Sequence, residues 1–234
     1  MPHPAAGWID ALPKTRPMAE YSLWSANLLA LGDDLTRVGD HADIYHIDVA
    51  DGVFAPSLLY FPDLVAALRK RTVVPFHVHL MVDDGVLMSQ VEQFDEAGAD
   101  LISVHVENGN AGLALARIRA LGLRCGVVLR VETPVAEAAG FMEGIDFLTL
   151  LGTRIGVKGQ GLDASAPARL RQAAGLIARR KATGRCVLAA DGGIREETVP
   201  LLVAAGAQTV VMGSLAYGAA DLGARMAWLH GLRG

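Results

Sequence analysis

The chain has little cysteine, little aromatic content and no excess of positive charge. Its 234 residues include only two cysteines, Cys125 and Cys186, and both lie inside apolar runs. Such thiols are typical of buried side chains in a reducing compartment rather than of a disulfide framework. The formal net charge is −4 at pH 7, which argues against a nucleic-acid partner held by a general basic field.

Long apolar runs and targeting signals are also missing. No stretch of eighteen residues is uninterruptedly apolar, so no membrane span is expected. The N-terminus has no basic start followed by an apolar block, which a secretory signal requires. We therefore expect a cytoplasmic protein with neither a membrane nor a nucleic acid as a partner.

Apolar residues, in contrast, are plentiful. They make up 52% of the chain, which is enough to bury a large core, and α/β barrels commonly use this length as one domain. Residues 1–18 are rich in proline and show no sustained period. We expect an N-terminal extension over 1–18 and one domain over 19–234.

Within that domain, short apolar runs alternate with helical patterns eight times. The predicted strands are 21–24, 44–49, 75–81, 101–106, 125–129, 147–151, 186–190 and 209–212. Alternating strands and helices predict a parallel sheet, and eight such units at this length predict a single-domain (β/α)₈ (TIM) barrel. An open doubly wound sheet is the alternative. No GxGxxG motif follows the first strand, so a dinucleotide is not expected.

Polar side chains mark the ends of three predicted strands. His46 and Asp48 share one face of the second strand, because side chains two residues apart point the same way. His79 lies in the third strand and Asp191 ends the seventh. A lone His-x-Asp pair is more often a solvated strand end. At the mouth of a barrel, however, two imidazoles and two carboxylates would form a mixed site for one divalent ion, such as Zn²⁺, Fe²⁺, Mn²⁺ or Co²⁺.

Three further polar residues accompany this set. His77 shares a strand face with His79 but lies deeper, so we interpret it as a hydrogen-bonded interior histidine. His105 and Glu107 form a second pair two residues apart. They either orient the metal ligands or are rim residues without a role.

Glycine-rich loops follow the last three predicted strands. They contain Gly156, Val157, Lys158, Gly159, Gly192, Gly193, Gly213 and Ser214. Glycine lets backbone N–H groups approach an anion, and barrels often bind phosphate at the loops after strands 7 and 8. Turns also need glycine, so the prediction of a phosphate site depends on three such loops on adjacent strands. Lys158 would add a positive charge.

The motifs of this chain, and their order along the sequence, resemble those of the ribulose-phosphate 3-epimerase family. HIDVADG at 46–52 resembles the family's HIDVMDG, and VHLMV at 78–82 matches its VHLMV. VHVE at 104–107, DGGI at 191–194 and GSLAYG at 213–218 follow in the family's order. The similarity extends from about residue 19 to the C-terminus.

The resemblance implies a metal-dependent isomerase that inverts C3 of a ketose phosphate. The default reaction is D-ribulose 5-phosphate to D-xylulose 5-phosphate. His46, Asp48, His79 and Asp191 would hold one divalent metal ion, and the two aspartates would also be the catalytic acid and base. Ser22 matches a family serine near the substrate, and Met81 a methionine beside the reacting carbon. The resemblance also implies a homo-oligomer, either a dimer or a hexamer.

The chemistry of these residue types agrees with that activity. Inverting a carbon next to a ketone requires removing its proton on one face and returning one on the other. Two carboxylates on opposite sides of the substrate can do this, and a metal ion offsets the charge of the enediolate between the two steps.

The chain departs from the family around the substrate. Ala50 and Leu151 stand where the family has methionine, and the loops at 130–133 and 151–160 diverge from its NPxT and MTVNPGFGGQ segments. Another ketose phosphate is therefore an alternative substrate, such as a tetrulose phosphate or a hexulose phosphate like allulose 6-phosphate.

Two other functions are possible for a barrel of this kind. A related barrel that catalyses decarboxylation or aldol chemistry needs a lysine at a strand end, and no predicted strand ends in one. A non-catalytic sugar-phosphate-binding barrel is the third hypothesis. Retention of both histidines and both aspartates argues against it.

Overall fold

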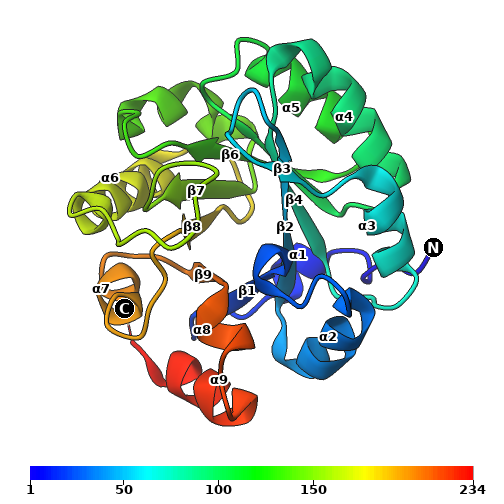
Figure 1. Cartoon of the computed structure of the whole chain (residues 1–234). Coiled ribbons are helices and arrows are strands. Elements are labelled where there is room, and N and C mark those ends of the chain that lie inside the picture. The colour runs from blue at the N-terminus through cyan, green and yellow to red at the C-terminus, as the bar shows by residue number, and fades with distance from the viewer. Residues whose placement is uncertain (234) are drawn as a thin grey trace.

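Eight parallel strands close into a barrel, and the helices form a ring outside it (Figure 1). The computed structural model describes residues 1–233. The barrel strands are β1 (Met18–Ser22), β2 (Ile44–Asp51), β4 (Phe76–Met81), β5 (Leu101–His105), β6 (Arg124–Leu129), β7 (Phe147–Leu151), β8 (Val187–Asp191) and β9 (Thr209–Met212). Strand β1 pairs in parallel with both β2 and β9, which closes the barrel. The predicted TIM barrel is confirmed. A short additional strand, β3 (Leu58–Leu59), pairs antiparallel with the end of β2.

Most of the connections are helical, as the sequence predicted. The α-helices are α1 (Trp8–Ala11), α2 (Leu31–Val38), α3 (Pro62–Arg69), α4 (Asp84–Glu96), α5 (Ala111–Ala120), α6 (Ala166–Arg179), α7 (Val199–Ala204), α8 (Ser214–Tyr217) and α9 (Leu222–Gly231). The 3₁₀ segments are η1 (Leu23–Ser25), η2 (Gly39–His41) and η3 (Val135–Gly144). The helix expected at 135–142 is thus a 3₁₀ segment; Gly140 and Gly144 disfavour a regular α-helix there. Across residues 1–233, no helix is both long and apolar enough to cross a membrane.

Strand residues alternate between two environments, as expected for strands buried on both faces. Tyr21, Tyr45 and Ile47 belong to the large apolar core between the barrel and its helices. Their neighbours Met18 and Ile44 point the other way, into the barrel, and form a second apolar cluster at the end where the strands begin. The barrel interior above this cluster is polar, and it leads to the opposite, carboxyl end of the strands.

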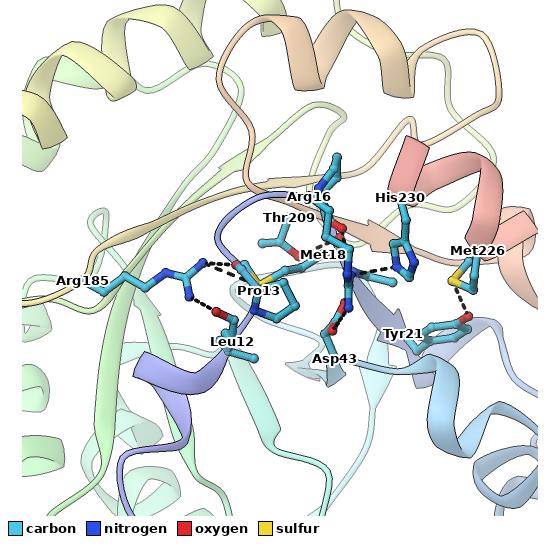
Figure 2. Close-up of polar contacts among 12 residues, drawn as sticks. Leu12, Pro13, Arg16, Met18, Tyr21, Asp43, Arg185, Thr209, Met226 and His230 are labelled. Atoms are coloured by element: carbon cyan, nitrogen blue, oxygen red, sulfur yellow. Dashed lines mark hydrogen bonds and ion pairs between the residues drawn. The ribbon is translucent and has the colours of Figure 1, made fainter. Parts of the chain in front are cut away.

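The segment before β1 packs against the barrel end where the strands begin. Ile9 and Leu12, in and just after α1, are buried in the second apolar cluster. Figure 2 shows Arg185, just before β8, donating hydrogen bonds to the carbonyl oxygens of Leu12 at 2.7 Å and Pro13 at 2.6 Å. In the same view Arg16 pairs with Asp43 at 2.8 Å. These contacts hold α1 as a plug under the barrel, away from the carboxyl ends of the strands.

Candidate metal centre and substrate cavity

The register of the strands brings the predicted metal ligands together. Asp48 of β2 lies opposite His79 of β4, and His46 of β2 lies opposite Ser22 of β1. Asp191 is the last residue of β8. Because all eight strands run in parallel, their carboxyl ends meet at one rim of the barrel, where the sites of this fold lie.

One nitrogen or oxygen atom from each of His46, Asp48, His79 and Asp191 lies within 4.8 Å of the others. His46 Nε2 is 3.3 Å from Asp48 Oδ1 and 3.9 Å from Asp191 Oδ2. His79 Nδ1 is 3.4 Å and 3.8 Å from the same two oxygens. Bonds of about 2.0–2.2 Å from a metal ion to nitrogen and oxygen put neighbouring ligands roughly 3.3 Å apart in a tetrahedral site. The cluster therefore has the dimensions of a mononuclear metal site.

Two orphaned nitrogen atoms support the same fit. His46 Nε2 and His79 Nδ1 are buried, and neither has a hydrogen-bond partner. Buried polar atoms are rarely left unpaired. These two face the same point between the two carboxylates, so a divalent cation there would satisfy both of them and offset the two negative charges. The four residues thus fit one divalent ion.

The tautomer of His79 follows from the residues behind it. His105 Nδ1 lies 2.9 Å from Glu107 Oε2, and His105 Nε2 lies 2.9 Å from His79 Nε2. A carboxylate only accepts hydrogen bonds, so His105 carries its proton on Nδ1 and accepts a hydrogen bond from His79 Nε2–H. His79 Nδ1 is then unprotonated and free to bind a cation. Of the two interpretations of His105 and Glu107, this geometry favours the one in which they orient a ligand.

The electrostatics of this chain agree with that assignment. Burial lowers the pKa of His105 to about 4, which keeps the ring neutral at pH 7. Burial acts to raise the pKa of Glu107, but His105, the Thr133 hydroxyl and the Arg130 N–H together outweigh it, and the pKa falls to about 2. The Glu107 carboxylate is therefore ionised, and it also accepts hydrogen bonds from the Arg130 N–H and the Thr133 hydroxyl.

The two aspartates lie in different surroundings. Asp48 accepts a hydrogen bond from the Ser22 hydroxyl at 2.8 Å through Oδ2, while its Oδ1 faces the histidines. Burial acts to raise the pKa of Asp48, but His46 and His79 more than offset this and the pKa is lowered. Burial raises the pKa of Asp191 to about 6, although His46 opposes the shift. Opposed shifts in two neighbouring carboxylates are typical of acid and base partners.

A cavity of about 420 Å³ lies directly over this cluster. Asp48, His79 and Asp191 line it, whereas His46 lies beneath. Every residue predicted to bind the substrate also lines it, namely Ser22, Met81, Gly156, Val157, Lys158, Gly159, Gly192, Gly193, Gly213 and Ser214. The three glycine-rich loops thus border one cavity together with three of the four predicted metal ligands.

Close approach of backbone segments explains several of these glycines. Gly192 and Gly193 have φ of 87° and 69°, a region that favours glycine. A Cβ atom on Gly193 would lie 2.8 Å from the Cα of Leu162, and one on Gly213 would lie 2.5 Å from Ser25 Oγ. A side chain at Gly193 would therefore push the loop after β8 away from the loop that carries Leu162, and one at Gly213 would displace the Ser25 side chain.

The loop between β7 and α6 spans the mouth of the cavity. Ser57 donates a hydrogen bond to the carbonyl oxygen of Gly156 at 2.6 Å, which ties this loop to the one after β2. On the other side, the Lys158 ammonium donates to the carbonyl oxygen of Trp24 and lies 4.9 Å from the centre of its indole ring. The loop after β2 and the loop between β7 and α6 are therefore in contact, and Lys158 reaches across to η1.

The positions that depart from the family pattern are distributed unevenly. Leu151 lines the cavity, as does the retained Met81, whereas Ala50 packs beside Met81 in a small apolar cluster and does not line it. Arg130 also does not line the cavity. Its guanidinium stacks 4.0 Å from the centre of the Phe54 ring and donates to the Phe54 carbonyl oxygen at 3.0 Å.

Sequence reasoning missed several residues near the site, among them Trp24, Arg195 and Glu20. Trp24 and Arg195 line the cavity, but neither belongs to a recognisable motif. Glu20 lies below the cavity, where its Oε2 atom is 3.0 Å from His46 Nδ1. The available signal for Glu20 was a single charged residue inside the apolar run of the first strand.

Comparison with known proteins gives the family. The sequence model of the Ribulose-phosphate 3 epimerase family matches residues 18–217. The chain belongs to this family. It is 34% identical over 202 residues to the ribulose-phosphate 3-epimerase of Bacillus subtilis, which covers 86% of this chain and 92% of the relative. It is also 30% identical over 221 residues to the chloroplastic ribulose-5-phosphate-3-epimerase of Arabidopsis thaliana, covering 93% and 77% of the two chains. Membership of the ribulose-phosphate 3-epimerase family confirms the predicted enzyme class, an isomerase that acts on carbohydrates.

Solved structures support the fold of this epimerase-family chain. A 3-hexulose-6-phosphate synthase superimposes with a TM-score of 0.65 at 19% identity, over 93% of this chain and all of the other. The orotidine 5'-phosphate decarboxylase of Pyrococcus horikoshii gives a TM-score of 0.63 at 17% identity, over 91% and 97%. At these identities the likeness concerns the barrel alone. Strands β1 to β9 contain no lysine, so the lysine expected for decarboxylase or aldolase chemistry is missing from all of them.

Proposed function

We propose that this chain is a metal-dependent 3-epimerase of a ketose phosphate, with D-ribulose 5-phosphate and D-xylulose 5-phosphate as the default pair. The observation that carries the proposal is the cluster of four ligand atoms within 4.8 Å, beneath a cavity bordered by three glycine-rich loops. His46, Asp48, His79 and Asp191 would hold one divalent ion, either Zn²⁺, Fe²⁺, Mn²⁺ or Co²⁺. When bound, the ion supplies Lewis acidity that offsets negative charge developing on the C2 and C3 oxygens of the substrate.

Asp48 and Asp191 are the proposed acid and base. Each has one oxygen facing the two histidines, which leaves its second oxygen for a proton. One aspartate removes the C3 proton from one face of the substrate, and the other returns a proton to the opposite face. Ser22 holds the second oxygen of Asp48 and keeps that carboxylate oriented. The roles of the two aspartates reverse with the direction of the reaction.

The glycine-rich loops supply the proposed phosphate site. Backbone N–H groups around Gly192, Gly193, Gly213 and Ser214 would bind the phosphate oxygens, and Lys158 would add a charge at the mouth. The loop that carries Gly156 and Lys158 would cover the bound substrate and exclude water from it. Met81 would pack against the reacting carbon.

Deuterium exchange tests the reaction directly. The metal-loaded protein is incubated in deuterated water with D-ribulose 5-phosphate, and ¹H NMR follows loss of the C3 proton together with formation of D-xylulose 5-phosphate. We expect both. Failure to exchange C3 of any ketose phosphate would refute the proposal and would favour a non-catalytic binding protein. Chelation should abolish exchange, and added metal should restore it.

The substrate alternative is tested in the same assay. The cavity differs from the family pattern at Leu151, which stands in place of a methionine, and it is also lined by the cations Lys158 and Arg154. The assay should therefore also include tetrulose phosphates and hexulose phosphates such as allulose 6-phosphate. The substrate with the highest kcat/KM identifies the ketose.

Assembly into a dimer or a hexamer remains a prediction, which mass photometry would test. A cytoplasmic location is also a prediction, which fractionation of cells would test.

A further inference from the structure

A second polar layer lies inside the barrel, directly beneath the proposed metal site. It consists of Glu20 on β1, His77 on β4 and Ser103 on β5, and the side chains of all three are fully buried. Glu20 Oε2 lies 3.0 Å from His46 Nδ1 and 2.8 Å from His77 Nδ1. His77 Nε2 lies 2.7 Å from the Ser103 hydroxyl oxygen. No sequence motif and no step of the proposed reaction accounts for this layer.

With both histidines neutral, the hydrogen bonds of the layer have one consistent assignment. The Glu20 carboxylate only accepts hydrogen bonds, so Nδ1 of both histidines carries a proton. His77 Nε2 is then free to accept the proton of the Ser103 hydroxyl, and His77 is neutral. His46 Nε2 faces the proposed metal site and has no other partner. Removing a carboxylate from water is costly unless such donors hold it, and here two imidazoles hold the same oxygen.

We infer that Glu20 is a positioning residue for the metal centre, acting through His46. Its carboxylate fixes the ring in the tautomer that leaves Nε2 unprotonated, holds its orientation, and makes Nε2 a stronger electron donor. His77, fixed by Ser103, keeps the carboxylate in place from the other side. This inference rests on the metal site of the proposed function, but it assigns a role to a residue outside the ligand set.

One alternative uses the same residues differently. Ligand-type atoms of Glu20, His46 and His77 also lie within 4.8 Å of one another, so they could hold a second ion. The distances of 2.8 Å and 3.0 Å from one oxygen to the two nitrogens are those of direct hydrogen bonds. They favour protons rather than a metal ion between these atoms. The number of metal ions bound per chain distinguishes the two arrangements.

The test compares Glu20→Gln with a matched control, Asp100→Asn. Asp100 is also a buried carboxylate, and it accepts hydrogen bonds from Arg69 and from the Phe76 N–H, both at 2.8 Å, at the beginning of the strands. Full-length metal-free proteins are titrated with Zn²⁺ against a chromophoric chelator, and circular dichroism monitors folding. We expect Glu20→Gln to bind one ion about 10–100-fold more weakly than the wild type. Asp100→Asn should lose stability but keep the wild-type affinity. At saturating metal, Glu20→Gln should recover most of its C3 exchange.

A measurement on the wild type covers the case in which Glu20→Gln does not fold. Imidazole ¹⁵N NMR of the Zn²⁺-loaded protein should show a protonated Nδ1 on both His46 and His77. An unprotonated Nδ1 on His46 would overturn the inference. Equal metal affinity of Glu20→Gln and the wild type would also overturn it, as would a loss of metal affinity in Asp100→Asn as large as that in Glu20→Gln. Two ions per wild-type chain, one of them lost in Glu20→Gln, would make Glu20 a ligand instead. A wild type that binds no metal at all would overturn the proposed function and this inference together.

Discussion

The ring of His105 stacks on the ring of His79, with their Nε2 atoms 2.9 Å apart and their centres 5.0 Å apart. His105 is thus the only hydrogen-bond partner found for His79 Nε2 among the described residues, and Glu107 fixes its tautomer. Each of the two histidines proposed as metal ligands is therefore held by a hydrogen-bond partner on the side away from the metal site. Glu20 stands behind His46, and the pair of His105 and Glu107 stands behind His79.

Replacing His105 should weaken metal binding without removing a ligand. A phenylalanine keeps the stacked ring but cannot accept a hydrogen bond, so His79 loses the partner that fixes its Nε2–H. We expect His105→Phe to bind Zn²⁺ about 10–100-fold more weakly, measured by chelator competition. His105→Asn, whose amide oxygen can accept a hydrogen bond, should lose less affinity for Zn²⁺ than His105→Phe. Equal affinities of His105→Phe and the wild type would show that the contact does not position His79.

The pKa of His105 also predicts how stability depends on pH. Burial lowers this pKa from 6.5 to about 4, so between these values the unfolded chain binds the proton that the folded chain excludes. Stability from this group is complete above pH 6.5 and is lost as the pH falls towards 4. The shift corresponds to about 3 kcal/mol. Urea unfolding of metal-free protein gives the free energy of unfolding at each pH from 4.5 to 7. This free energy should rise more steeply with pH in the wild type than in His105→Asn. Equal slopes in the two proteins would contradict the assignment.

The two aspartates should be far more sensitive than other carboxylates near the cavity. Asp191→Asn removes both a proposed ligand and a proposed acid or base, and loss of general acid–base catalysis alone typically costs 10²–10⁴-fold in rate. We expect C3 exchange to fall by at least that factor. Asp163→Asn is the matched control, because Asp163 lies in the loop before α6, is exposed, and accepts hydrogen bonds from the N–H and the hydroxyl of Ser165. An Asp191→Asn rate within tenfold of the control would exclude the proposed role.

Lys158 should affect substrate binding more than the chemical step. Its ammonium lies at the mouth of the cavity and is held by Trp24. Hydrogen bonds to charged groups are worth about 1.5–3 kcal/mol, so Lys158→Ala should raise KM for a phosphorylated ketose by roughly 10–100-fold, with a smaller change in kcat. Lys181→Ala, at an exposed position after α6, should leave both constants unchanged. Initial rates over a range of substrate concentrations separate the two constants, and an unchanged KM would exclude a contact with phosphate.

The alternation of strands and helices was enough to predict the barrel, and the barrel rule was enough to bring His46, Asp48, His79 and Asp191 to one rim. The prediction of the first strand was less accurate. It was expected at 21–24, but β1 spans Met18–Ser22. A carboxylate within an apolar run argues against a buried strand. Glu20 is nevertheless buried there, because histidines 26 and 57 residues further along the chain supply its hydrogen bonds.

Contacts between distant loops were beyond sequence reasoning for the same reason. The loops at 52–61 and 152–165 are long, and loops of this length in a compact domain are commonly functional. Their mutual contact through Ser57 and Gly156, and the reach of Lys158 to Trp24, depend on distances of 99 and 134 residues along the chain. Arg130 illustrates the opposite case. It directly follows β6, but its guanidinium stacks on Phe54 and does not line the cavity.

The plug formed by α1 should stabilise the barrel without contributing to its chemistry. Ile9 is only 2% exposed and packs with Met18, Ile44 and Phe147 at the end of the barrel where the strands begin. Truncating a buried isoleucine to alanine typically costs 2–5 kcal/mol, so Ile9→Ala should lower the free energy of unfolding by about that amount in urea titrations. Leu113→Ala, at a position 65% exposed, should change it by less than about 0.5 kcal/mol. Because Ile9 lies at the opposite end from the cavity, C3 exchange by folded Ile9→Ala should equal that of the wild type. A large loss of exchange at a temperature where the variant is folded would mean that the plug also shapes the polar layer above it.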